Sequence, residues 1–198
     1  MNIHPILVHF PIALLTIYAI LEIAIPLKIK AFRLFKWDIP EVSPRFEKMY
    51  QLLINPIWIS IKAFLVILGT VLTFATLQTG EWAEHMYMSY ATDYTAFAQS
   101  EVGQLIELHS TFATATVIIF SILAVAYLLR LVPLLVSLPQ SMLAVSAKIQ
   151  NIVLNVYIAP LLALLGIIAI TITGALGGAI AHGSDTDPVV QMIYSLFF

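Results

Sequence analysis

The sequence contains no cysteine. This absence excludes disulfide bonds, thiolate metal sites, iron–sulfur clusters and haem attached covalently through a cysteine pair. Any metal ion must therefore be held by His, Met or carboxylate side chains. The redox compartment of the protein does not follow from the missing cysteine.

Charged residues are scarce. Only 10% of the 198 residues are charged and 61% are apolar, whereas a soluble domain has about 25% charged and roughly 45–50% apolar residues. These proportions exclude a soluble globular protein. Nine Lys and Arg residues and a net charge of −2 also exclude the basic surface that nucleic-acid binding needs. No catalytic triad or phosphate-binding loop is recognisable.

Long apolar runs take the place of the missing charges. There are four, at about residues 3–27, 57–79, 109–129 and 152–181. A helix needs about 20 apolar residues to cross a bilayer. We therefore expect an all-α integral membrane protein, an up-and-down bundle of four transmembrane helices that forms a single domain over residues 1–198. The first run lacks the basic start and small-residue cleavage site of a signal peptide, so we expect it to be a mature helix.

All Lys and Arg residues fall on one side of this topology: Lys28, Lys30, Arg33, Lys36, Arg45, Lys48, Lys62, Arg130 and Lys148. The positive-inside rule makes that side cytoplasmic, which puts both termini outside the cytoplasm and the protein in the inner (cytoplasmic) membrane. Residues 28–50 mix cations with large apolar side chains and are expected to lie in the cytoplasmic interface. Residues 80–108 are expected to form an extracytoplasmic loop.

The five histidines all lie toward the extracytoplasmic side: His4 and His9 in the first run, His85 just beyond the second, His109 at the start of the third and His182 at the end of the fourth. Helical bundles build cofactor sites from side chains that face one another across the core, and an ionisable residue at membrane depth indicates function. The alternative is a solvated histidine near the interface, which applies most to His4 and His85.

The fourth run carries glycine on one stripe. Gly166, Gly174, Gly178 and His182 follow the spacing i, i+8, i+12 and i+16. Such a stripe is typical of close helix packing. It is equally what a flat macrocycle would need if it lay against Gly174 and Gly178, below the imidazole of His182.

Four motifs resemble one known family. They are HPILVHFP at residues 4–11, Thr79-Gly80-Glu81-Trp82, His109, and GALGGAIAHG at residues 174–183. Together the motifs resemble the bacterial membrane family catalogued as domain of unknown function 2231. Some of its members are joined to redox modules such as Rieske-type domains, which implies electron transfer. His85 is not part of that pattern, and Ala179-Ile180-Ala181 replaces the family's acidic and aromatic stretch.

Three functions compete on this evidence. The first is a b-type cytochrome, an electron-transfer subunit rather than a stand-alone enzyme, with one or two noncovalent haem b groups ligated by histidine pairs. We expect His9 and His109 to form one pair, because their helices are diagonal in the bundle, and His182 to serve a second site with His85 or His4. The other two functions are a Cu or Zn site that uses His9, His85, His109 and His182, and a structural subunit of a larger membrane complex.

The residues around His85 add to the metal alternative, since Met86 and Met88 carry thioethers that suit Cu(I). An interfacial aromatic belt with Trp82 explains the same stretch and is favoured. The outer side carries seven carboxylates, Glu81, Glu84, Asp93, Glu101, Glu107, Asp185 and Asp187. They predict that a cationic electron carrier, or a larger redox complex, docks there by electrostatic steering.

Overall fold

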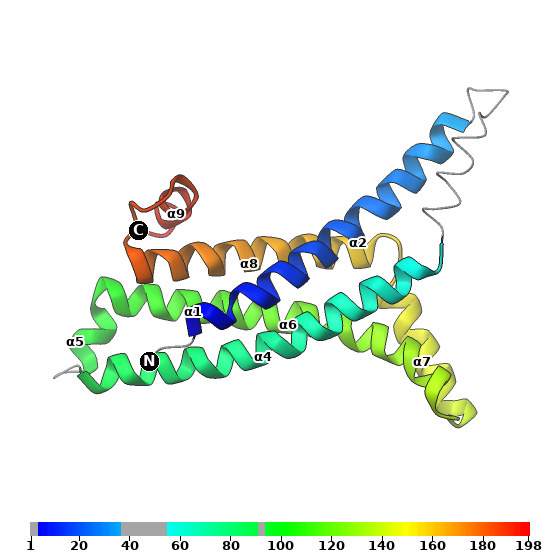
Figure 1. Ribbon diagram of the computed structural model, residues 1–198, viewed down its shortest axis with the longest axis horizontal. Helices are drawn as coiled ribbons and strands as arrows, with labels where there is room; N and C mark the ends of the chain where they lie inside the picture. The colour runs from blue at the N-terminus through cyan, green and yellow to red at the C-terminus, as the bar shows by residue number, and fades with distance from the viewer. Residues whose placement is uncertain (1–3, 37–54, 91–93) are drawn as a thin grey trace.

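The computed structural model describes residues 4–36, 55–90 and 94–198, and all regular elements in these ranges are helices. The long helices are α2 (His9–Lys36), α4 (Ile57–Tyr90), α6 (Glu101–Leu135) and α8 (Ile158–His182). The shorter ones are α1 (His4–Leu7), α5 (Tyr94–Gln99), α7 (Gln140–Val153) and α9 (Pro188–Tyr194). Figure 1 shows α1 and α9 at one end of the molecule and α7 at the other.

Three helices are long and apolar enough to cross a membrane. Their candidate spans are Ile57–Met86, Glu101–Pro133 and Ile158–His182. The apolar stretch found in α2, His9–Ile25, is shorter. The described chain is therefore an all-helical protein with membrane-spanning character, while the fourth crossing and the orientation of the bundle stay predictions.

The four long helices pack around a common core. Helices α2 and α6 each pack against both α4 and α8, so α2 and α6 lie diagonally opposite each other. Leu15, Phe120 and Leu123 are fully buried in this core. Glycine permits close approach at two points, because a Cβ on Gly69 would lie 2.6 Å from Leu15 and one on Gly166 would lie 2.6 Å from Phe120. Close packing thus explains Gly166, the first member of the glycine stripe.

A proline divides the first apolar run. Pro11 has no N–H to donate to the carbonyl of Leu7, and a turn at Val8 separates α1 from α2. Helix α1 then packs against α4. His4 lies beside α4 in this arrangement, where its ring contacts Thr79.

The described part of the segment predicted as a loop, residues 80–108, is mostly helical, while its place outside the cytoplasm stays a prediction. Helix α4 continues to Tyr90, α5 follows, and α6 already begins at Glu101. Residues 81–90 contain no proline and are rich in Glu, Ala and Met, which favour helix. The hydroxyl of Ser100 accepts from the Gly103 N–H at 3.2 Å and caps α6. His109 therefore lies two turns inside α6 rather than at its start.

The segment predicted to lie in the cytoplasmic interface, residues 28–50, is covered only in part. Its first residues continue α2 as far as Lys36. Residues 37–50 lie outside the described ranges. Whether the segment lies in the interface stays a prediction. The connection between the third and fourth runs is itself helical, since α6 extends to Leu135 and α7 covers Gln140–Val153.

Candidate functional site: a histidine-lined pocket

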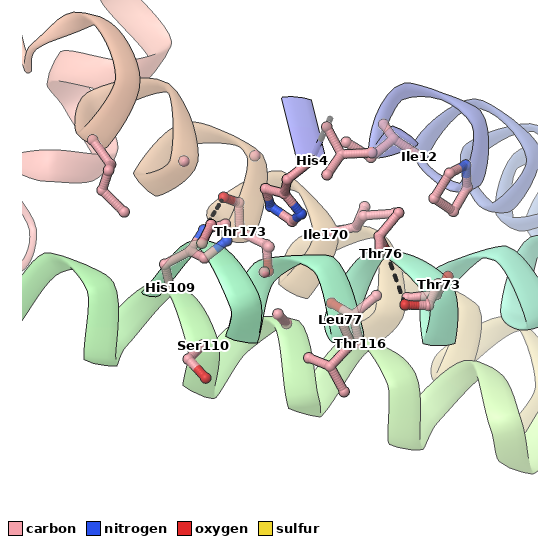
Figure 2. Close-up of a pocket in the computed structure, with 18 of the residues that line it drawn as sticks. His4, Ile12, Thr73, Thr76, Leu77, His109, Ser110, Thr116, Ile170 and Thr173 are labelled. Atoms are coloured by element: carbon pink, nitrogen blue, oxygen red, sulfur yellow. Dashed lines mark hydrogen bonds between the residues drawn. The ribbon is translucent and has the colours of Figure 1, made fainter. Parts of the chain in front are cut away.

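A pocket of about 470 Å³ opens among α1, α2, α4, α6 and α8 (Figure 2). Ligand sites in proteins have volumes of about 300–1,000 Å³. Four of the five histidines line this pocket: His4, His9, His109 and His182. Most of the remaining lining is apolar, with Ile12, Leu77, Val117 and Ile170 among it. The fold thus brings together residues from opposite ends of the sequence.

His109 is held in a defined orientation by α8. Its Nδ1 atom lies 2.9 Å from the carbonyl oxygen of Thr173, as Figure 2 shows. A carbonyl can only accept, so Nδ1 carries the hydrogen. In the neutral imidazole the lone pair is then on Nε2, the nitrogen that is left for a ligand. The ring also packs against Gly177, where an added Cβ would lie 3.0 Å from Cε1 of His109.

His4 is oriented in the same way by α4. Its Nδ1 lies 3.0 Å from the Thr79 hydroxyl oxygen, and that hydroxyl donates to the Thr76 carbonyl at 2.9 Å. The single hydroxyl hydrogen is used in that bond, so Nδ1 of His4 is the donor to Thr79. A Cβ on Gly80 would lie 3.2 Å from Cε1 of His4. His4 and His109 are close enough to interact electrostatically.

The other three histidines are more exposed than His4 and His109. His9 and His182 line the pocket, but both residues are exposed overall. His85 is exposed and is not among the residues that line the pocket. The axial pair predicted from the sequence, His9 with His109, stays a prediction. Within residues 4–36, 55–90 and 94–198 no three His, Asp or Glu side chains come together in a group that could hold a metal ion.

The glycine stripe of α8 serves more than one purpose. Gly174 lines the pocket, and a Cβ added to it would meet no atom within 4 Å. Gly178 also lines the pocket, but it lies against α9, with Val190 3.2 Å from its added Cβ. Gly177 and Gly80, which pack against the two oriented imidazoles, were not singled out as site residues. Gly80 lies in the motif at residues 79–82 and Gly177 in the motif at residues 174–183. These motifs were the sequence signal that could have identified the two glycines.

The outer carboxylates also divide into groups. Glu81 and Glu84 line the pocket. Asp187 caps α9, since its carboxylate accepts from the Val189 N–H at 2.7 Å. Glu101 accepts a hydrogen bond from Tyr194 of α9, and this bond raises the pKa of the Tyr194 hydroxyl. Glu101 therefore links α9 to α6, whereas Asp187 caps α9 itself.

Comparisons with protein families, curated proteins and solved structures found no match to this chain. The resemblance stated from the sequence motifs therefore stays a prediction. The functional argument depends on the chain's own residues.

Proposed function

We propose that the pocket binds haem b noncovalently, with His109 and His4 as ligands to the iron, and that the protein transfers electrons. The observation that carries this proposal is the matched orientation of the two imidazoles. Each uses Nδ1–H in a hydrogen bond to its surroundings, Thr173 O for His109 and Thr79 Oγ1 for His4. Histidines that ligate metals are typically oriented by such a bond from the other ring nitrogen.

The lining of the pocket fits a flat, apolar group. Aliphatic residues and glycines together make up more than half of the pocket lining, and the missing side chain of Gly174 leaves open space beside α8. Haem supplies one-electron chemistry at its iron, while the protein binds it, orients it and sets its polarity. His4 is preferred to His9 as the second ligand because a hydrogen bond to Thr79 orients its ring, whereas His9 is exposed.

The membrane arrangement belongs to the same proposal. We take α2 as a fourth crossing beside the three candidate spans, with both termini outside the cytoplasm and the pocket near the outer face. The support is the distribution of Lys and Arg in the sequence and the packing of α2 against α4 and α8. An electron carried by the pocket would then be exchanged near the extracytoplasmic face of the inner membrane.

An optical spectrum tests the proposal. The protein is purified in mild detergent from cells supplied with haem, and its reduced and oxidised spectra are compared. We expect a reducible Soret and α band, which His109→Ala and His4→Ala remove or convert to a five-coordinate spectrum. His85→Ala is the matched control, because His85 does not line the pocket. A native protein without haem, or both variants with unchanged spectra, would overturn the assignment.

A further inference from the structure

A buried charged cluster lies between α2, α4 and α6. Glu22 is only 4% exposed, and Nζ of Lys62 lies 3.1 Å from each of its carboxylate oxygens. The Tyr127 hydroxyl donates to the same carboxylate at 2.7 Å. Removing two charges from water is costly even when they pair, and ionisable residues inside membranes typically mark a function.

Few other charged or titratable groups face this cluster. Tyr18 lies one turn before Glu22 on α2, and its ring centroid is 6.0 Å from that of Tyr127. Arg130, one turn beyond Tyr127 on α6, is exposed and interacts with it electrostatically. Helix α8 carries no Asp, Glu, Lys or Arg. The cluster is therefore built by three of the four long helices.

Three buried hydroxyl groups lie on the same three helices. They are Oη of Tyr18, Oγ1 of Thr70 and Oγ of Ser121, and within the described ranges none of them has a partner at full hydrogen-bond geometry. Oη of Tyr18 still interacts with Glu22 and Tyr127 and so adjoins the charged cluster. Thr73, Thr76 and Thr116, by contrast, donate to carbonyls of their own helices. Buried polar groups without a protein partner are typically satisfied by ordered water.

The unpaired hydroxyls lie between the charged cluster and the pocket. At 1.5 Å per residue, Thr70 lies about 12 Å along α4 from Lys62, and Thr76 lies about 9 Å farther. On α6, Ser121 lies about 9 Å from Tyr127 and about 7.5 Å from Thr116. Thr73, Thr76 and Thr116 line the histidine pocket. Hydroxyl groups thus occur at intervals from the Glu22–Lys62 pair to the pocket.

We propose that water molecules held by Tyr18, Thr70 and Ser121 complete a proton path from the Glu22–Lys62 pair to the histidine pocket. A proton enters at the end of the bundle opposite the pocket and adds to a carboxylate oxygen of Glu22, which then releases a proton to the first water. Each water or hydroxyl then accepts one proton and releases another, so no group is consumed and no redox partner is needed. The last proton is released to water in the pocket. This inference goes beyond the proposed function, since the path does not require haem.

Proton entry into vesicles tests the path. The purified protein is reconstituted into phosphatidylcholine vesicles that contain a pH-sensitive dye, and a potassium diffusion potential, negative inside, drives protons inward. We expect acidification several-fold faster than in empty vesicles. Thr70→Val, Ser121→Ala and Tyr18→Phe, which each remove one hydroxyl, should lower the rate several-fold. The matched control is Thr114→Val, because Thr114 is an exposed residue of α6.

Native vesicles no faster than empty ones would overturn the path. So would hydroxyl-deletion variants that match both the native protein and Thr114→Val. Circular dichroism checks the fold of each variant, and three independent deletions keep the test decisive if one of them fails to fold. The haem spectrum of each preparation is recorded as well. A preparation without haem that still conducts protons counts against the haem proposal alone.

Discussion

The carbonyl oxygen of Thr173 accepts a hydrogen bond from Nδ1 of His109 at 2.9 Å and so joins α8 to α6 at the wall of the pocket. One turn farther along α8, Gly177 packs against the same imidazole. One turn of α8 therefore fixes both the tautomer of His109 and the position of its ring. The two contacts allow the ring's role and the helix's packing to be tested separately.

Two glycines on α8 should respond differently to alanine. Gly174→Ala should raise the free energy of unfolding of the haem-free protein by about 0.5–1 kcal/mol, because alanine favours helix over glycine and the new Cβ meets no atom within 4 Å. Gly177→Ala should raise the free energy of unfolding by less, since its Cβ would lie 3.0 Å from Cε1 of His109. Thermal unfolding in detergent measures both. Equal gains in the free energy of unfolding for the two variants would show that Gly177 does not confine the His109 ring.

A larger side chain at Gly174 should test whether a ligand occupies the pocket. Gly174→Leu would project into open pocket space, so we expect the helical content to be unchanged while the haem bound per protein falls strongly. Circular dichroism and a pyridine haemochrome assay measure the two quantities. Thr171→Leu, at an exposed position of α8 outside the pocket lining, is the control. Haem retained at the native level in Gly174→Leu would place the ligand elsewhere.

Removing one partner of the buried Glu22–Lys62 pair should destabilise the protein far more than removing both partners together. Lys62→Met leaves the Glu22 carboxylate buried without its cation, and losses of this kind cost about 3–5 kcal/mol. In Glu22→Gln combined with Lys62→Met no unpaired charge is left, so part of the loss should be recovered. Unfolding of the single and double variants measures the difference. A double variant as unstable as the sum of both single variants would contradict this account.

The broad fold was predictable because it depends on composition. Runs of about 20 apolar residues separated by polar residues predict membrane helices from the cost of unpaired backbone groups in lipid. The helix ends were not predictable in this way, since hydrophobicity reports where lipid ends rather than where a helix ends. Helix α4 continues through Gly80 to Tyr90, beyond the end of its apolar run at residue 79.

The sequence predicted the histidines that line the site, but it did not predict how their side chains are oriented. Four of the five histidines and Gly174 line one pocket as a group, because side chains at the same depth of a bundle converge on its core. The sequence alone did not favour His4, since a terminal residue carries no sign of where its ring points. The orientation of its ring depends on Thr79, a contact across 75 residues.

Single cysteines should report the orientation of the bundle, since the chain has no cysteine of its own. Ser184→Cys, which follows α8, should react with a membrane-impermeant maleimide added to intact cells. Ser137→Cys, between α6 and α7 at the opposite end, should react only after the membrane is permeabilised (Figure 1). Labelling of position 137 in intact cells, with position 184 protected, would show that the bundle has the opposite orientation.

Helix α7 should depend on a proline in α6. Pro133 has no N–H, so the Leu129 carbonyl loses its partner in the helix. Two side chains of α7 donate to that oxygen instead, Ser146 and Gln150, each at 3.2 Å. Gln150→Ala should therefore lower the free energy of unfolding by about 1 kcal/mol, while Asn151→Ala, at an exposed position, should have little effect.

The same contact predicts a coupling between the two helices. Pro133→Ala supplies an N–H that can bond to the Leu129 carbonyl, so in that background Gln150→Ala removes a donor whose acceptor is already satisfied. The cost of Gln150→Ala should then shrink, and a double-mutant cycle measured by thermal unfolding isolates the difference. Additive effects would mean that Gln150 stabilises α7 through Ser146 alone, to which it also donates at 2.8 Å. A reduced cost would instead show that α7 docks on α6 because the proline exposes a carbonyl for it to bind.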